Sequence, residues 1–140
     1  MTSPVVHYFE DVVLDAVLET PAMTVTETHV ALYTGLTREV AEPGSVPDGL
    51  PLCLCTGLGW RATQSPISVR AFLGFEWAVR QPVRVGDTLH SSARPIIKRA
   101  MRDGGVLVEE RKVINQRGEV VQEGKFMYLI DRRPPEETSA

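Results

Sequence analysis

The sequence has two cysteines, Cys53 and Cys55, whose thiols could act as nucleophiles or metal ligands, and they lie two residues apart in an apolar stretch. On a helix, residues at this spacing point in different directions, and no third or fourth ligand for zinc lies nearby. The pair is also a poor framework for a disulfide. We therefore expect two reduced thiols that pack in the core, with neither a metal nor a cofactor.

The segment Asp48-Gly49-Leu50 offers a second kind of chemistry, because it has the features of a helix start. Asp48 is a typical N-cap, and Gly49 lets a ligand come close to the backbone. The N–H groups of Gly49 and Leu50 could then hold a carbonyl oxygen at the positive end of the helix. The alternative is a plain capped helix in which Asp48 satisfies its own backbone.

Four predicted elements in the first half of the chain must position these residues. The pattern predicts a strand over residues 19–26 and a helix over 27–36, with Thr26 as its N-cap. Residues 37–47 contain two prolines and a glycine and predict a loop. A second helix is predicted over 48–62, and its apolar residues surround most of its circumference, so we expect it to be buried.

The second half of the chain predicts strands separated by regular turn signals. We expect strands over 69–79, 88–101, 106–115 and 119–130, with a hairpin turn at Asp103-Gly104-Gly105. One buried helix covered by an antiparallel sheet is an α+β arrangement. Because such a sheet leaves an edge strand exposed, we expect pairing with a second copy in a homodimer.

Length, composition and charge place limits on the function. The 140 residues are 43% apolar, which is enough for one core domain, predicted over residues 1–133 and followed by a disordered tail over 134–140. The net charge of -3 is spread without long runs of one sign, so neither nucleic acid nor an anionic membrane is an expected partner. The sequence shows neither a secretory leader nor a long apolar run, which predicts a cytoplasmic protein.

Five short stretches occur in a recognisable order along residues 8–133. They are Tyr8-Phe9-Glu10-Asp11, Thr24-Val25-Thr26-Glu27, Leu32-Tyr33-Thr34-Gly35-Leu36-Thr37, Pro82-Val83-Arg84-Val85-Gly86-Asp87-Thr88-Leu89 and Asn115-Gln116-Arg117-Gly118-Glu119-Val120-Val121. Together they resemble the MaoC-like dehydratases and (R)-specific enoyl hydratases. No single stretch is decisive, but their order favours this family over a chance match.

This resemblance implies a single hotdog domain, in which an antiparallel sheet wraps a central helix. It also implies a dimer and a substrate bound between subunits as a thioester of coenzyme A or of an acyl carrier protein. The family's reaction is a reversible loss or gain of water, with an Asp and a His in the loop after the first helix moving the protons. Backbone N–H groups at the start of the buried helix polarise the thioester carbonyl, a role that falls here to Gly49 and Leu50.

The loop departs from the family pattern Gly-Asp-x-x-x-Pro-x-His. Glu39 stands where the Asp should be, and Gly44 or Ser45 stands at the His position. Glu39 could still act as a base, with Ser45, Asp48 or His29 as a polar partner in a rearranged active site. The alternative is a solvated loop carboxylate paired with Arg38.

Aromatic residues of the second predicted helix and of the strand after it could form the walls of an acyl pocket. Trp60 and Phe75 are the candidates for substrate binding, together with Phe72 and Trp77. The alternative is that these side chains simply fill the core.

Four functions are compatible with these residues. The first is hydration or dehydration of an enoyl or 3-hydroxyacyl thioester, and the second is a hotdog thioesterase in which Glu39 or Asp48 activates water. The third is cyclisation or isomerisation of a polyketide-like substrate. The fourth is a non-catalytic subunit in a heterodimer with an active hotdog chain.

Overall fold

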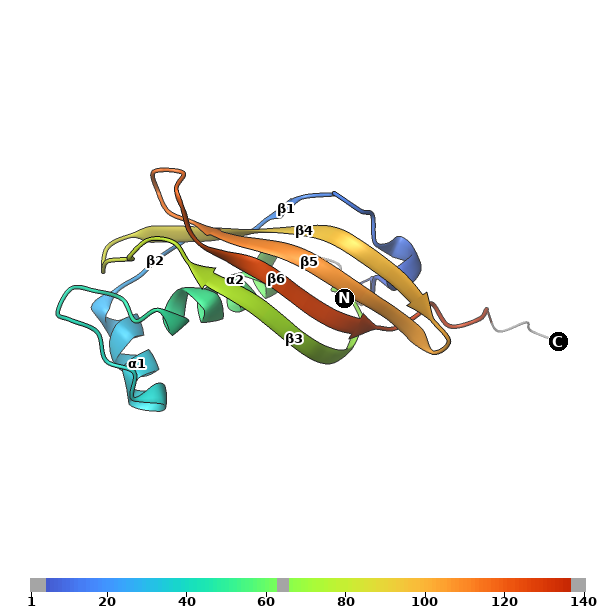
Figure 1. Cartoon of the computed structure of the whole chain (residues 1–140), viewed down its shortest axis with the longest axis horizontal. Helices are drawn as coiled ribbons and strands as arrows, with labels where there is room; N and C mark the ends of the chain where they lie inside the picture. The colour runs from blue at the N-terminus through green and yellow to red at the C-terminus, as the bar shows by residue number, and fades with distance from the viewer. Residues whose placement is uncertain (1–4, 63–65, 137–140) are drawn as a thin grey trace.

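A curved antiparallel sheet packed against one long helix organises the chain in the computed structural model, which describes residues 5–62 and 66–136 (Figure 1). The sheet has the strand order β1-β4-β5-β6-β3, and β2 also pairs with β4. The elements in chain order are η1 (Phe9–Asp11), β1 (Leu18–Glu19), β2 (Met23–Thr24), α1 (Glu27–Thr37), α2 (Gly49–Ala62), β3 (Val69–Val79), β4 (Thr88–Met101), β5 (Gly104–Ile114) and β6 (Val120–Ile130). This confirms the predicted α+β class.

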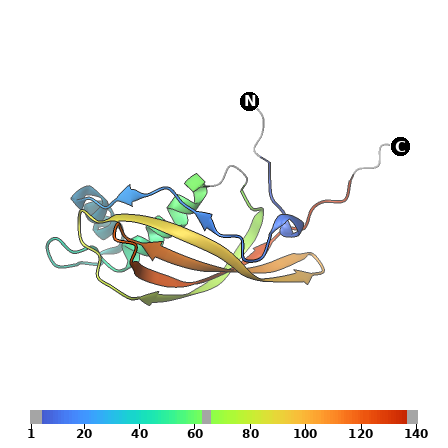
Figure 2. The ribbon, with the colours of Figure 1, turned by 90° about the horizontal axis from the view of Figure 1, so that it is seen from above.

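Helix α2 lies along one face of the sheet, where it contacts β4 and β5 (Figure 2). The side chains that it buries recur at helical spacing: Leu50, Pro51, Cys55 and Leu58. The opposite side of the helix is exposed, with Trp60 at 69%. The predicted helix bounds are confirmed. The expectation that the helix is buried because apolar residues surround most of its circumference was wrong, since only one side of it is buried.

The four long strands match their predicted positions closely. β3 and β4 have the predicted bounds, whereas β5 begins two residues earlier than expected, at Gly104. Gly104 pairs with Met101, so the hairpin turn consists of Arg102 and Asp103. Gly104 has φ 155°, and a Cβ there would lie 2.6 Å from the Ile130 carbonyl oxygen, which explains why this strand opens on glycine.

The predicted strand over residues 19–26 was wrong in its extent. The chain instead forms the two-residue strands β1 and β2, both antiparallel to β4. Pro21 lies between them and has no N–H to donate to a ladder, which explains the interruption.

Helix α1 begins and ends as the sequence predicted, to within one residue. Thr26 is its N-cap: the Thr26 Oγ1 accepts from the His29 N–H at 3.4 Å, and the Thr26 N–H donates to His29 Nδ1 at 3.0 Å. The helix ends at Thr37, where Arg38 adopts the left-handed conformation with φ 62° and donates to the Thr34 carbonyl at 2.8 Å. The chain is thereby turned back toward the start of α2.

The two cysteines differ in burial, and the described part of the C-terminal tail is exposed. Cys55 is buried in the core, with its Sγ 2.9 Å from the Ser91 Oγ, but Cys53 is exposed, so its expected core position was wrong. Residues 134–136 are exposed and have no regular structure, and the rest of the predicted tail, 137–140, lies outside the described residues. No helix in the described part of the chain is long and apolar enough to cross a membrane.

Candidate functional site

The start of α2 brings Glu39 and Gly49 together. The Tyr33 hydroxyl donates to Glu39 Oε2 at 2.5 Å, and the Gly49 N–H donates to Glu39 Oε1 at 3.4 Å. Glu39 is half-buried. The structure therefore places this carboxylate against the positive end of the helix rather than in solvent beside Arg38.

Local hydrogen bonds fix the backbone of Glu39 in this position. Its carbonyl accepts from the Thr34 Oγ1 at 2.9 Å, and its N–H donates to the Thr37 Oγ1 at 3.1 Å. Glycine is required at position 49, because a Cβ there would overlap the Tyr33 hydroxyl and lie 3.1 Å from Glu39 Oε2. The hydrogen bond to Glu39, together with burial, raises the pKa of Tyr33 to about 12, so this phenol remains a donor at neutral pH.

The other predicted residues of this site lie around the helix start without joining the Glu39 cluster. Leu50 is buried in the core, and its N–H donates to the Pro47 carbonyl at 3.1 Å. Asp48 is exposed, and its backbone carbonyl accepts from Gln122 Nε2 at 2.8 Å. Ser45 forms a backbone bridge with Arg84. Both N–H groups expected to hold a thioester carbonyl therefore already have partners within the chain.

The three histidines make their contacts away from Glu39. His29 closes the N-terminus of α1, as described above. His90 Nε2 lies 3.1 Å from Glu19 Oε2 at the β1–β4 edge. His7 forms a bridge with Ile67 and lines a cavity. Among the residues that the structure describes, no histidine is therefore paired with Glu39 to take the proton-carrying role of the family's histidine.

A cavity of about 540 Å³ lies between the C-terminal half of α2 and the sheet. Trp60 lines it, as predicted for a substrate-binding residue, and so does Phe72. Phe75 does not line it: its ring stacks on Phe72 at 6.0 Å and meets Phe126 edge-on at 6.2 Å. The further apolar wall comes from Leu18, Ile67, Val69, Ala93 and Leu107.

A buried polar cluster on β5 and β6 forms part of the cavity lining. Arg111 Nε lies 3.5 Å from Glu109 Oε2, and the two side chains are only 11% and 8% exposed. Arg111 also donates to the Tyr128 hydroxyl at 3.3 Å and to the Cys55 sulfur at 3.9 Å, and it stacks over the Phe126 ring at 5.0 Å. Arg111 Nε itself has no hydrogen-bond partner among the described residues.

The surroundings shift the titration of this cluster. Burial on its own would lower the pKa of Arg111, but the adjacent Glu109 carboxylate opposes this and the pKa is raised overall. Burial raises the pKa of Tyr128 to about 12, against the opposing effect of Arg111. At neutral pH the cluster therefore holds a guanidinium cation and a neutral phenol.

Sequence reasoning missed this cluster, although a signal was present. In β5 the side chains of Leu107, Glu109, Arg111 and Val113 alternate with those facing away, so they share the face that packs against α2. Two charged residues at inward positions of an otherwise apolar strand are rare unless they are paired or functional.

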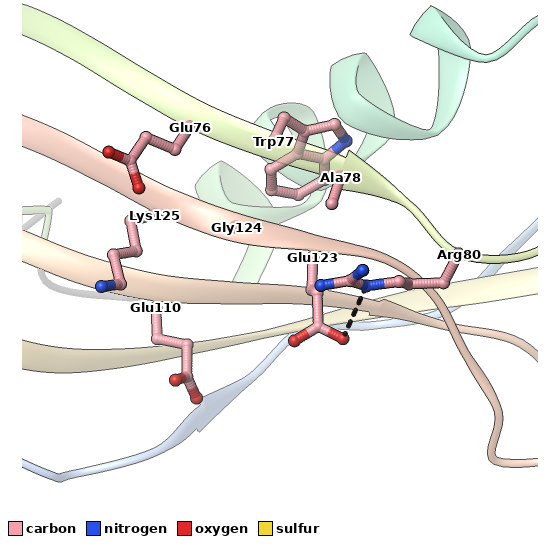
Figure 3. Close-up of a pocket in the computed structure, with 8 residues that line it drawn as sticks. All are labelled: Glu76, Trp77, Ala78, Arg80, Glu110, Glu123, Gly124 and Lys125. Atoms are coloured by element: carbon pink, nitrogen blue, oxygen red, sulfur yellow. Dashed lines mark ion pairs between the residues drawn. The ribbon is translucent and has the colours of Figure 1, made fainter.

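A second, shallower depression of about 270 Å³ involves charged side chains of β3, β5 and β6 (Figure 3). Its charges alternate in sign across the strands, with Glu76 and Glu110 opposite Lys125 in register. Arg80 Nε lies 3.6 Å from Glu123 Oε2. This arrangement is typical of a self-paired solvent face.

Comparison with known proteins identifies the fold. No protein-family model and no curated protein matches the sequence. Among solved structures, a monoamine oxidase regulatory protein from Archaeoglobus fulgidus has a TM-score of 0.87 at 26% identity, covering 96% of this chain and 100% of that one. A MaoC-like dehydratase from Rhodospirillum rubrum has a TM-score of 0.76 at 18% identity, covering 91% and 99%.

An (R)-hydratase, PhaJ1 from Pseudomonas aeruginosa, has a TM-score of 0.75 at 14% identity, covering 94% of this chain and 96% of that one. These matches extend over nearly the whole of both chains, so they concern the complete sheet and both helices. The chain is therefore a hotdog-fold protein, and its structural neighbours include MaoC-like dehydratases and (R)-hydratases, as the sequence resemblance predicted.

Proposed function

We propose that the chain acts on an acyl thioester of coenzyme A or of an acyl carrier protein, adding or removing water with Glu39 as the base. The observation that carries this proposal is the position of Glu39, which is held at the N-terminus of α2 by Tyr33 and Gly49. The structural neighbours support it, because two of them are a MaoC-like dehydratase and an (R)-hydratase.

In the hydration direction, Glu39 would take a proton from a water molecule as the water oxygen bonds to carbon 3 of an enoyl thioester. Glu39 then gives this proton to carbon 2, which returns the carboxylate to its starting form, and the negative charge that develops on the thioester oxygen in between needs a donor. The Gly49 N–H would supply it by leaving Glu39, to which it is bonded at a long 3.4 Å. Tyr33 would keep the carboxylate oriented throughout.

We further propose a cytoplasmic homodimer that pairs β3 with β3 of a second copy. β3 is an edge strand of the sheet. Five of its apolar side chains are between 41% and 53% exposed: Val69, Phe72, Leu73, Phe75 and Val79. An exposed apolar edge strand is stabilised by pairing, and the joined sheets would cover this surface.

A non-catalytic subunit is the second candidate, and a specific observation favours it. Both carboxylate oxygens of Glu39 already accept hydrogen bonds from the chain, and the loop offers glycine or serine where the family has its histidine. Such a subunit would bind the thioester, or an active hotdog partner, without moving protons.

Mass spectrometry of a thioester panel distinguishes the two candidates. Enoyl and 3-hydroxyacyl thioesters of coenzyme A and of an acyl carrier protein are incubated with the wild type, with Glu39→Gln and with Glu42→Gln. Glu42 is an exposed carboxylate in the same loop, so it provides a matched control. We expect a mass change of one water in the wild type and the control, and a rate lower by roughly 10²–10⁴-fold in Glu39→Gln.

Each other outcome has a definite meaning. Hydrolysis to the free acid that depends on Glu39 would replace the hydratase by a thioesterase using the same carboxylate. Substrates that all return unchanged, together with a stable complex with another hotdog chain, would establish the non-catalytic subunit. Equal rates in the wild type and Glu39→Gln would show that Glu39 is not the base.

A further inference from the structure

Among the residues that the structure describes, the guanidinium of Arg111 has fewer hydrogen-bond acceptors than donors. A guanidinium has five N–H donors, and residues 5–62 and 66–136 give this one a phenol oxygen at 3.3 Å and a thiol sulfur at 3.9 Å, both at long distances. Its Nε has no hydrogen-bond partner in this part of the chain, although Glu109 Oε2 is 3.5 Å away. A buried cation in this state has capacity for a further oxygen acceptor.

Small residues lie beside Arg111 on two sides and leave room for that acceptor. In register, Arg111 faces Ala93 on β4, which also lines the cavity. From the helix, Gly59 lies above it, since a Cβ at this position would be 3.5 Å from Arg111 Nη1. Larger side chains at these positions would fill the space beside the guanidinium.

The rest of the cavity suits an apolar chain. Its volume of about 540 Å³ is within the range of small-molecule sites, and most of its lining is aliphatic or aromatic. Trp60 lines it while remaining 69% exposed, so the cavity meets the surface beside α2. Phe72, which is 53% exposed in the single chain, lines it from β3, the strand that the proposed homodimer would cover. The polar cluster lies on the sheet side, along β5 and β6.

The charge of the Glu109–Arg111 pair determines which kind of ligand oxygen the cavity can accept. Glu109 and Arg111 together are neutral, so the site does not require an anion, and a carboxylate ligand would place a second negative charge near Glu109. A ketone or ester carbonyl can accept from the guanidinium without this repulsion. We infer that the cavity binds an apolar chain bearing a neutral carbonyl oxygen, which accepts a hydrogen bond from Arg111.

This inference goes beyond the proposed reaction and does not depend on it. Glu39 is not among the residues that line the cavity. The helix rise of 1.5 Å per residue separates the α-carbons of Gly49 and Gly59 by about 15 Å, so the two sites lie at different ends of α2. Binding at Arg111 can therefore be measured whether or not Glu39 performs chemistry.

Calorimetric titration with matched probes tests the inference on the full chain. Octyl β-glucoside carries an apolar chain on a head group that stays in solvent, its 7-oxo derivative adds one ketone near the chain end, and a third probe ends in a carboxylate. We expect the ketone to bind the wild type about tenfold more tightly than the plain chain, as one hydrogen bond to a charged donor implies. We expect the carboxylate probe to bind no more tightly than the ketone.

Variants that remove the charged pair or narrow the cavity test which feature binds the probes. Arg111→Met alone would leave Glu109 buried and unpaired, so Glu109→Gln combined with Arg111→Met is used to remove the charges together. In this double variant the tenfold ketone preference should disappear. Gly59→Ala, whose methyl group fits without overlap, should weaken all chain probes by narrowing the cavity, and Arg80→Met on the paired charged face should change nothing.

Several results would overturn the inference. Equal binding of the ketone and plain chains to the wild type would show that Arg111 does not recognise a carbonyl, as would a ketone preference that survives in the double variant. Tighter binding of the carboxylate would show that the site takes an anion. A ketone preference that persists in Glu39→Gln supports the inference even if the proposed hydration fails.

Discussion

The two ends of α2 carry polar clusters that are built in opposite ways. At the N-terminus both oxygens of Glu39 receive a donor from the chain, and Gly49 is required for this contact. Beside the C-terminal half, Arg111 and Glu109 are more deeply buried, yet the guanidinium lacks acceptors and faces a cavity. A satisfied cluster must exchange a bond before it can act, whereas an under-satisfied one can bind a ligand without losing anything.

The largest contrast concerns stability. Arg111→Met leaves the Glu109 carboxylate buried without its partner, and we expect the free energy of unfolding to fall by about 3–5 kcal/mol. Glu39→Gln keeps an oxygen acceptor for Tyr33, and we expect a loss of about 1 kcal/mol or less. Denaturant unfolding of both variants measures the difference. Equal losses of free energy would show that leaving Glu109 unpaired costs no more than neutralising Glu39, so that burial does not distinguish the two carboxylates.

Adding Glu109→Gln to Arg111→Met sharpens the same contrast. Since the second change removes the unpaired charge, we expect most of the lost stability to return in the double variant. A double variant as unstable as Arg111→Met alone would mean that the loss comes from packing of the arginine side chain.

Glycine replacements in α2 give the next largest effect. Gly49→Ala would force the new methyl group against the Tyr33 hydroxyl, and we expect a loss of about 1–3 kcal/mol. Gly57→Ala is the control: no atom lies within 4 Å of its Cβ, and the helical preference of alanine should add about 1 kcal/mol. Thermal unfolding compares the two. Stabilisation by both changes would show that Tyr33 does not pack against the helix start.

The smallest effect is a difference in tyrosine titration. The raised pKa of Tyr33 comes first from its hydrogen bond to Glu39, whereas that of Tyr128 comes first from burial, and both reach about 12. Glu39→Gln should therefore lower the pKa of Tyr33 toward 10 and leave that of Tyr128 unchanged. Phenolate absorbance during an alkaline titration measures both, with Tyr33→Phe and Tyr128→Phe assigning the two transitions.

The same shifts have a consequence for stability at alkaline pH. A tyrosine that ionises near 12 in the folded state and near 10 when unfolded stabilises the fold below pH 10, and this contribution is lost as the pH rises toward 12. The decline should be shallower in Tyr33→Phe. An unchanged slope would place Tyr33 outside the Glu39 hydrogen bond.

The contrast between the helix ends also shows what sequence reasoning can find. Propensity, capping and turn residues predicted α1, α2 and the long strands, because each has its own local signal, such as Thr26 before α1. The strand broken at Pro21 was predicted as continuous, since the pairing of β1 and β2 with β4 depends on contacts distant in sequence.

Only some residues of the candidate sites could likewise be predicted from the sequence. The family resemblance pointed to Glu39 and Gly49 because both lie in or beside a recognisable motif, but it did not reveal that they bind each other. Glu109, Arg111 and Tyr128 belong to no motif that the sequence displays. They meet only because register pairs β5 with β6 and because α2 leaves a cavity over them.

Steady-state kinetics on an enoyl thioester that the wild type hydrates would compare the two ends of α2 in one experiment. We expect Glu39→Gln to lower kcat by roughly 10²–10⁴-fold, and the Glu109→Gln, Arg111→Met double variant, altered at the other end of α2, to maintain kcat. The opposite pattern, with kcat lost in the double variant and kept in Glu39→Gln, would place the reaction in the cavity at Arg111 and would contradict the role proposed for Glu39.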